Sequence, residues 1–424
     1  MSSARNIYQD GVDFSVLALQ SSSFAKFLKP NSQLDFSDPE AVHLNYILWV
    51  QDLLDTTSDK YIDRYDASRE VVGLDIGTGA SCIYPLLGCV QRPKWRFAAT
   101  DIDDNSLQTA QKNVENNKFQ SRVRLVKTSI EDALIPLGSI GIDGIDFTMC
   151  NPPFYASKEE MISSANDKQR PPFSACTGAE VEMVTTGGEV AFVQRMIRES
   201  LDLRERVEWY STMLGKLSSV FTTVERLREI GIENYAVTEF VQGSKTRRWA
   251  IAWSWGDMRP SMVRRSKVLS LNESQLMRHV DQSVARGLSS LPKSLLPFPS
   301  ESTLTLSSAS IDTTGQQINA VLKSLNLQWQ WKQSMATGVG FAEGNVWSRA
   351  SRRKHKISGD AAEEEDEDAN EVNFGFKIQV KAEKGSADVK ILIRWLKGND
   401  SVLFESFCGM LKRKVTSETL RDLG

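Results

Sequence analysis

The segment Asn151-Pro152-Pro153-Phe154 has the residue types and order needed to bind an aromatic amine. The side-chain oxygen of Asn151 and the carbonyl oxygen of Pro152 can both accept hydrogen bonds from one exocyclic NH2 group. On an adenine ring such an amine is a poor nucleophile because its lone pair is delocalised. The two bonds favour the pyramidal nitrogen that attacks a methyl sulfonium in line. The prolines restrict the backbone so that the carbonyl points outward, and Phe154 can stack on a base that has left its neighbours.

A turn that merely ends a strand is the alternative for this segment, because asparagine and proline are common turn residues. Residues 145–150, directly before it, are predicted to form a strand. Open α/β sheets bind their ligands at the carboxyl ends of the strands. This position, downstream of a glycine-containing segment, favours the interpretation as a catalytic motif.

That glycine-containing segment includes Asp75, Gly77 and Gly79, at the end of a predicted strand and the start of a helix. The glycines let the backbone approach a ligand closely, and the helix offers unpaired N–H groups. Asp101 follows Asp75 by 26 residues, at the end of the next predicted strand, where a carboxylate can bind two ribose hydroxyls. The pattern indicates a nucleoside-containing cofactor. A dehydrogenase and a tight turn without a ligand are the alternatives.

The residue types in this turn favour S-adenosylmethionine over a dinucleotide as the cofactor. Cys82 stands where a dinucleotide-binding turn has its third glycine, so no seat for a pyrophosphate is expected. Asp75 then supplies a negative charge near the methionine amino group. A methylated amine loses its proton readily to water, so a chain with only three histidines can manage without a general base. No metal site is predicted, because the five cysteines include no Cys-x-x-Cys pair.

Strands that alternate with helices must position these segments, which predicts a parallel sheet covered by helices. The predicted strands are 71–75, 95–100, 123–126, 145–150, one starting at Trp209, 235–241 and 248–255. The predicted helices between them are 104–117, 190–203 and 224–230. Two more helices, 14–28 and 42–54, are expected before the first strand.

Four regions are expected along the chain. Residues 1–70 are predicted to be helical, 71–256 to form the sheet domain and 257–300 to form a polar connector. Residues 301–424 are predicted to form a small α+β domain. A disordered insertion at about 350–371 interrupts it, because that segment has nothing apolar to bury.

The composition is that of an ordinary folded chain, with 41% hydrophobic and 25% charged residues. No apolar run approaches the ~20 residues that cross a bilayer, so no membrane partner is expected. The start of the chain has no signal-peptide pattern, which favours an intracellular protein. The net charge is −3, but residues 363–371 contribute seven acids, and without them the charge becomes +4. This balance permits contacts with phosphate and does not require them.

Five segments closely resemble the methyltransferase-like protein 16 family, which methylates N6 of an adenosine in U6 small nuclear RNA. They are 75–88 (beginning Asp-Ile-Gly-Thr-Gly-Ala-Ser-Cys), 151–154, 209–216, 235–243 and 248–253. The resemblance covers most of residues 8–256. Together with the strand pattern it predicts a Rossmann-like class I methyltransferase with a mostly parallel seven-stranded sheet, plus the small C-terminal α+β domain.

The resemblance implies S-adenosylmethionine as cofactor, U6 small nuclear RNA as the RNA partner, a monomer and a nuclear location, with cytoplasmic residence as an addition. It implies cofactor contacts at Gly77, Ser81, Asp101 and Asn151, and an adenine sandwich that involves Phe154. RNA contacts are implied for Lys168, Arg170, Lys245, Arg248 and the N-terminal region. For each of these basic residues, a solvated surface position is the alternative. Weaker resemblance extends to the C-terminal domain, where Lys377, Lys381 and Arg394 are candidates for phosphate contacts.

The chain departs from the family at the junction of Val42 and His43. The family has a longer helical segment, with a basic residue, between Asp-Pro-Glu-Ala-Val and Leu-Asn-Tyr-Ile, whereas residues 38–42 here run directly into His43. A real deletion and a mis-spliced gene model are the alternatives. His43 thus stands where the family has an arginine that reaches the cofactor's carboxylate or the RNA. We expect this change to affect cofactor affinity and N-terminal RNA contacts. Two alternative functions remain. Related Asn-Pro-Pro-aromatic enzymes modify other RNAs, DNA adenines or protein glutamine amides, and a catalytically weak RNA-binding factor would keep the same fold.

Overall fold

The computed structural model describes residues 40–61, 65–153, 155, 157, 185, 187–242, 246–261, 291–307, 309–349, 351, 372–382 and 388–419. They fall into two compact units. The first contains the described residues up to Gly256, apart from 57–61, together with 291–297. The second contains 57–61, 257–261 and the described residues from Phe298 onward. None of the described helices is long and apolar enough to cross a membrane.

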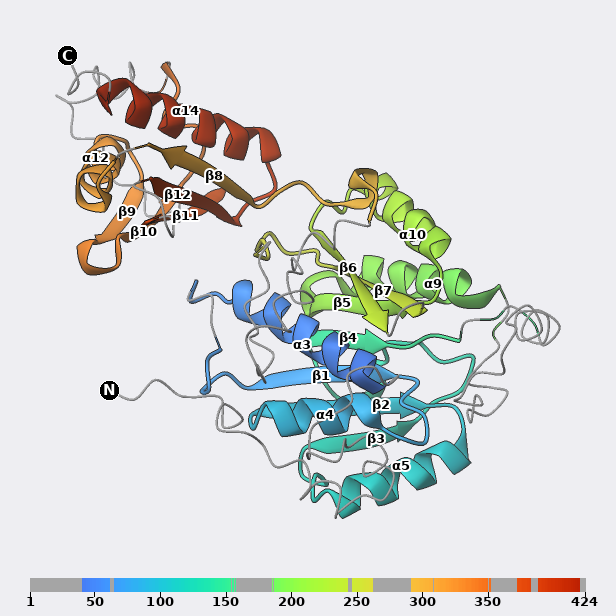
Figure 1. Ribbon diagram of the computed structural model, residues 1–424. Coiled ribbons are helices and arrows are strands. Elements are labelled where there is room, and N and C mark those ends of the chain that lie inside the picture. The colour runs from blue at the N-terminus through green and yellow to red at the C-terminus, as the bar shows by residue number, and fades with distance from the viewer. Residues whose placement is uncertain are drawn as a thin grey trace, which may run out of the picture. The chain divides into compact units, whose positions relative to one another are not determined.

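Seven strands form the sheet of the first unit, in the order β3-β2-β1-β4-β5-β7-β6 (Figure 1). They are β1 (Val71–Ile76), β2 (Trp95–Asp101), β3 (Val123–Lys127), β4 (Ile145–Cys150), β5 (Val207–Leu214), β6 (Tyr235–Gln242) and β7 (Thr246–Trp253). β7 runs antiparallel to β5 and β6, and the other neighbours pair in parallel. The predicted Rossmann-like, mostly parallel seven-stranded sheet is therefore confirmed. Its order differs from that of dinucleotide-binding sheets by the insertion of β7 between β5 and β6.

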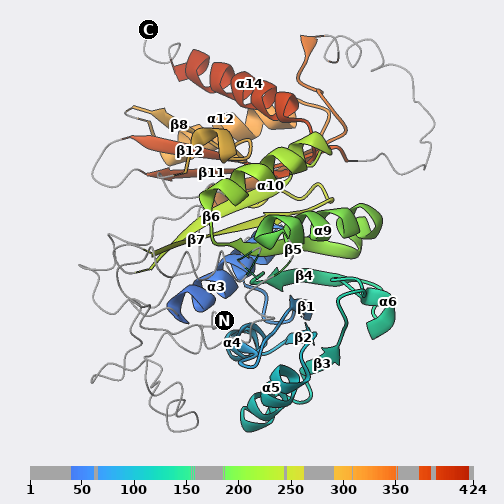
Figure 2. The same ribbon diagram turned by 90° about the vertical axis from the view of Figure 1, so that its right-hand side faces the viewer.

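Helices cover both faces of this sheet (Figures 1 and 2). On one face lie α3 (Glu40–Thr56), α4 (Ile83–Gln91) and α5 (Asp104–Asn116). On the other face lie α6 (Leu137–Ile140), α9 (Gly188–Leu203) and α10 (Leu217–Glu229). Each face thus has its own apolar core. Strands enclosed in this way need apolar side chains at successive positions, which explains the continuous apolar runs in their sequences.

The main difference from the predicted elements is α10, which begins at Leu217 and not at Val224. Its first turns are rich in serine and threonine, which have modest helix propensity. Val220, Val224 and Leu227 are nevertheless fully buried, and they share one face of the helix. Packing of that face stabilises the helix where propensity alone does not. The helix expected at 42–54 is confirmed as α3, and the helix expected at 14–28 lies outside the described residues.

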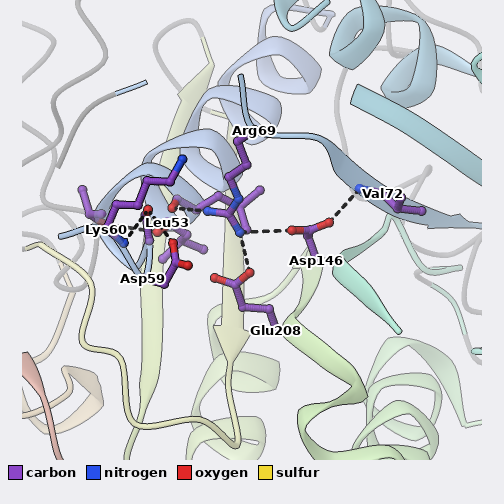
Figure 3. A network of polar contacts seen from close by, with 10 residues as sticks. Leu53, Asp59, Lys60, Arg69, Val72, Asp146 and Glu208 are labelled. Atoms are coloured by element: carbon purple, nitrogen blue, oxygen red, sulfur yellow. Dashed lines mark hydrogen bonds and ion pairs between the residues drawn. The ribbon is translucent and has the colours of Figure 1, made fainter. Parts of the chain in front are cut away.

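A cluster of charged side chains joins α3 to the amino ends of the central strands (Figure 3). One guanidinium nitrogen of Arg69 donates to Asp146 at 3.0 Å and to Glu208 at 2.6 Å. The other donates to the carbonyl oxygen of Leu54 on α3, at 2.9 Å. Asp146 also accepts the backbone N–H of Val72 at 2.7 Å. These bonds hold β1, β4, β5 and α3 together at the amino ends of the strands. The predicted site lies at the opposite, carboxyl ends.

The second unit is an antiparallel sheet of order β8-β12-β11-β10-β9, against which two helices pack. Its elements are β8 (Glu301–Leu306), α12 (Ile311–Lys323), β9 (Gln328–Lys332), β10 (Thr337–Ala342), β11 (Phe374–Ala382), β12 (Val389–Lys397) and α14 (Ser401–Thr419). Aromatic side chains from β11, β12 and α14 form much of the core, with Phe376 and Phe407 at 4.1 Å between ring centroids. The predicted small α+β domain is confirmed.

The predicted phosphate contact of Arg394 is wrong. Its side chain is 1% exposed, and one guanidinium nitrogen donates to the carbonyl oxygen of Arg259 at 3.3 Å. Burial lowers the pKa of Arg394 to about 9. Alternation along β12 would place Arg394 on the face of exposed Lys390, but residues 393–396 are all buried, which the sequence pattern does not reveal. Lys381 is exposed and Lys377 is half-buried, so phosphate contacts by these two stay predictions.

Candidate active site

The glycine segment forms a left-handed turn between β1 and α4. Gly77 and Gly79 have φ angles of +70° and +62°, which other residues adopt only with strain. A Cβ atom added at Gly77 would meet nothing within 4 Å, so the space above the turn is open. The backbone N–H of Thr78 donates to the carbonyl oxygen of Thr100 at 2.9 Å and ties the turn to β2. The turn is therefore shaped for close approach of a ligand to the backbone.

Asp75 ends β1 with a carboxylate that lies almost wholly inside the protein, at 1% exposure. One carboxylate oxygen accepts the hydroxyl of Thr78 at 2.7 Å, and the other has no partner among the described residues. Burial, with a smaller contribution from the negative charge of Asp101, raises the pKa of Asp75 to about 7. A buried acceptor without a partner is costly, and a cationic ligand would relieve that cost. The site thus fits the positively charged end of S-adenosylmethionine.

Asp101 lies at the carboxyl end of β2, next to this turn, and is 5% exposed. One of its oxygens accepts the N–H of Gly79 at 2.8 Å, and the other accepts the N–H of Asp103 at 2.8 Å. Each oxygen keeps a second acceptor position. The carboxylate therefore organises the turn, and its predicted contact with ribose hydroxyls stays a prediction. Ser81, also predicted to contact the cofactor, is exposed at the start of the following helix.

Asn151 leaves the carboxyl end of β4 beside the glycine turn. The pairing of Asp75 with Met149 and of Ile76 with Cys150 places Asn151 next to Gly77, since each residue follows directly on its strand. The side-chain oxygen of Asn151 is buried and has no hydrogen-bond partner within the described ranges. Pro152 is buried and Pro153 is half-buried, while Phe154 lies outside the described residues. An acceptor is thus available where the catalytic motif was predicted.

The predicted RNA-binding residues are not brought together by the part of the chain that the structure describes. Lys168, Arg170 and Lys245 lie outside it. Arg248 is on β7 opposite Phe240, and side chains of opposed residues share one face of a sheet. Phe240 belongs to the apolar core between the sheet and α3, so Arg248 lies on the face of the sheet that α3 covers.

His43 lies near the start of α3, with its ring edge-on to Tyr84 at 5.3 Å between centroids. Burial lowers the pKa of His43 to about 4, so the imidazole is neutral at physiological pH. Its Nδ1 atom is buried without a partner among the residues described. A neutral ring cannot supply the positive charge of the arginine expected at this position. His43 therefore contributes no positive charge to this region at physiological pH.

Two polar side chains that the sequence reasoning missed shape the loops of the site. Glu189 on α9 is 2% exposed and accepts the backbone N–H groups of Gly215 and Lys216, at 2.6 and 3.1 Å. Asn113 on α5 donates to the carbonyl oxygen of Ala80 at 3.0 Å and so holds the glycine turn. A glutamate in the first turn of a helix is the signal that could have revealed Glu189, whereas Asn113 has no local signal.

Taken together, the reversed β7, the open glycine turn and the Asn-Pro-Pro segment at the end of β4 define a Rossmann-like class I methyltransferase. Asp75 and Asn151 present two buried oxygens on neighbouring strand ends, one suited to a cation and one to an amine. Within the described ranges, no group of three or more histidine, cysteine, aspartate or glutamate side chains is arranged to hold a metal ion.

Comparison with known proteins agrees with this class. A sequence model described as RNA methyltransferase matches residues 42–257. A Schizosaccharomyces pombe protein named U6 small nuclear RNA (adenine-(43)-N(6))-methyltransferase is 35% identical over 368 residues, which cover 87% of this chain and 84% of that protein. Human RNA N(6)-adenosine-methyltransferase METTL16 is 40% identical over 296 residues, which cover 60% of this chain and 50% of that protein. The crystal structure of the human Mettl16 catalytic domain with a MAT2A 3'UTR hairpin is 37% identical at a TM-score of 0.45, covering 60% of this chain and 95% of that one.

The chain belongs to this RNA methyltransferase family, as the resemblance of its motifs predicted. It spans most of the fission-yeast relative and about half the length of the human one.

Proposed function

We propose that this chain transfers the methyl group of S-adenosylmethionine to N6 of an unstacked adenosine in a structured RNA, with U6-type small nuclear RNA as the substrate. The RNA methyltransferase family supports the reaction class, and the name of the fission-yeast relative supports the RNA and the atom. The similarity to that relative extends over both compact units of the chain.

The observation that carries the proposal is the buried side-chain oxygen of Asn151 beside the Gly77 turn, which has no hydrogen-bond partner among the described residues. An acceptor in this state favours a ligand that brings an N–H donor. The neighbouring oxygen of Asp75, likewise without a partner in the part of the chain that the structure describes, favours a cation. A base with an exocyclic amine and a cofactor with a positive charge satisfy both groups at once.

The chain's contribution to the reaction is positioning and hydrogen bonding. When bound, S-adenosylmethionine supplies an electrophilic methyl group on a sulfonium. The side-chain oxygen of Asn151 and the carbonyl oxygen of Pro152 accept hydrogen bonds from the two N–H groups of the target amine and direct its lone pair away from the ring. The Gly77 turn allows the cofactor to approach the backbone, and Asp75 balances its charge. The methylated nitrogen then loses one proton to water, so no side chain needs to act as a base.

Methyl transfer from labelled S-adenosylmethionine to a U6-like hairpin tests the proposal. Asn151→Ala and an RNA whose target adenosine is replaced by guanosine serve as controls. We expect transfer that both changes abolish, with the product identified as N6-methyladenosine. Tight RNA binding without transfer would instead identify an RNA-binding factor, and transfer to a glutamine-containing peptide would identify a protein methyltransferase.

We also propose that the protein is nuclear, because its proposed substrate belongs to nuclear particles, and that it acts as a monomer. Microscopy of a tagged chain tests the location. Light scattering of the purified chain, alone and with RNA, tests the monomer; a mass of two chains in both samples would contradict it.

A further inference from the structure

The pairing between β4 and β5 ends before these strands reach the site. Their parallel ladder joins Ile145 with Val207 and Phe147 with Trp209 and goes no further. β4 continues for three more residues, to Cys150, and Asn151 follows it. Along this last stretch, β1 is the only one of the described strands that holds the main chain of β4 by regular pairing.

Side chains bridge the gap that the ladder leaves. The hydroxyl of Ser211 on β5 donates to the carbonyl oxygen of Thr148 at 2.6 Å, and the N–H of Ser211 donates to the hydroxyl oxygen of Thr148 at 3.0 Å. The hydroxyls of Tyr46 and Ser211 lie 2.8 Å apart. The N–H of Cys150 donates to the oxygen of Tyr46 at 3.4 Å.

The direction of each hydrogen bond follows from the groups involved, because a carbonyl oxygen can only accept and a backbone N–H can only donate. The proton of the Ser211 hydroxyl is used on Thr148, so Tyr46 must donate its own proton to Ser211. The oxygen of Tyr46 is then free to accept from Cys150. A chain of three bonds therefore runs from the last residue of β4, through Tyr46 and Ser211, back to Thr148 on β4.

The ring of Tyr46 is held firmly enough to act as a fixed support. It is fully buried, it meets Tyr84 edge-on at 5.4 Å between centroids, and it lies 6.3 Å from Phe240. Tyr46 belongs to α3, about 100 residues before the motif that it supports. The packing of α3 on the sheet therefore helps to fix the position of Cys150, the residue before Asn151.

We propose that Tyr46 is a positioning residue for methyl transfer, whose hydroxyl sets the course of the main chain where Asn151 and Pro152 leave β4. This inference rests on the proposed function. Without the hydroxyl, the backbone N–H of Cys150 loses the acceptor that α3 provides, and the main chain at the strand end gains freedom. Because the acceptor atoms of the motif must be placed within a fraction of an ångström, a small shift is expected to lower turnover with little effect on binding.

Tyr46→Phe tests this, because it keeps the ring and removes one oxygen. Tyr84→Phe is the matched control: its hydroxyl is also buried in the same aromatic cluster, but it bonds to the sulfur of Met213, at 3.2 Å, and not to β4. We expect Tyr46→Phe to lower kcat about tenfold or more. The KM values for RNA and S-adenosylmethionine should stay within about twofold, and Tyr84→Phe should leave kcat within about twofold.

Ser211→Ala extends the test, because it removes the acceptor of the Tyr46 proton. The double variant Tyr46→Phe/Ser211→Ala should be no slower than Ser211→Ala alone, since both changes break one chain of bonds. Unchanged kcat in Tyr46→Phe, or an equal loss in Tyr84→Phe, would overturn the proposal. Should Tyr46→Phe fail to fold, unchanged kcat in Ser211→Ala would overturn it as well. An inactive wild-type protein would contradict the proposed function and not the role of Tyr46 alone.

Discussion

Replacing Asp75 with asparagine should stabilise the ligand-free protein relative to wild type as the pH rises to neutral and alkaline values. The same change should weaken cofactor binding. The carboxylate is 1% exposed, and only one of its oxygens has a partner among the described residues. Burial raises the pKa of Asp75 from 3.8 to about 7. The folded protein therefore holds a proton on this group over a pH range in which the unfolded chain has released it.

The sign and size of the effect follow from this difference in pKa. Between pH 4 and pH 7 the folded state binds more protons, so the free energy of unfolding falls as pH rises. The contribution of the protonated Asp75 side chain to the free energy of unfolding is fully present below about pH 4 and is lost once the pH passes about 7. With 1.36 kcal/mol for each pKa unit, the shift from 3.8 to about 7 amounts to about 4 kcal/mol. Asparagine does not ionise and escapes this loss.

Urea denaturation of both proteins from pH 4 to pH 8 measures the effect. The difference in unfolding free energy between Asp75→Asn and wild type should move by up to about 4 kcal/mol in favour of the variant as pH rises. The side-chain oxygen of asparagine can still accept from the hydroxyl of Thr78. Cofactor affinity of the variant at pH 8 should fall at least about tenfold, because a charge is lost. A stability difference that does not change with pH would refute the reasoning.

Three further changes probe the motif, the turn and the charged cluster. Asn151→Ala should lower kcat by about 100-fold or more, with RNA affinity nearly unchanged in binding assays, because the acceptor acts mainly on the developing charge. Gly77→Ala should cost about 1–2 kcal/mol in thermal unfolding, since its φ is +70°. Gly138→Ala is its control, because that site is equally open and has no positive φ. Arg69→Ala should cost about 2 kcal/mol in chemical denaturation, because it removes the cation that two partly buried carboxylates share.

Each of these expectations has an outcome that contradicts it. Equal loss of RNA affinity and turnover in Asn151→Ala would indicate a role in binding. Equal destabilisation by Gly77→Ala and Gly138→Ala would show that conformation is not the cause. Arg96→Ala breaks an exposed ion pair with Glu70 and should cost less than about 0.5 kcal/mol. If Arg96→Ala lost as much unfolding free energy as Arg69→Ala, partial burial would not explain the stabilisation by the Arg69 cluster.

The amino-acid sequence by itself determined the parallel sheet, the two motifs and their place at the carboxyl ends of β1 and β4. These features depend on local order along the chain: apolar runs make enclosed strands, two glycines make a left-handed turn, and Asn151 directly follows a strand. The reaction class follows from the same residues, since the positions of donors and acceptors within a short motif are set by the chain itself.

Only the tertiary structure decided which distant side chains support the site and which charges are buried. Tyr46 reaches Cys150 across 104 positions, and Arg69 reaches Glu208 across 139. Such contacts leave no local pattern, because they depend on how α3 packs on the sheet. Burial likewise made His43 neutral and enclosed Arg394, although both look like surface residues in sequence. Solvation in the folded state sets the charge of a group, and spacing along the chain does not report it.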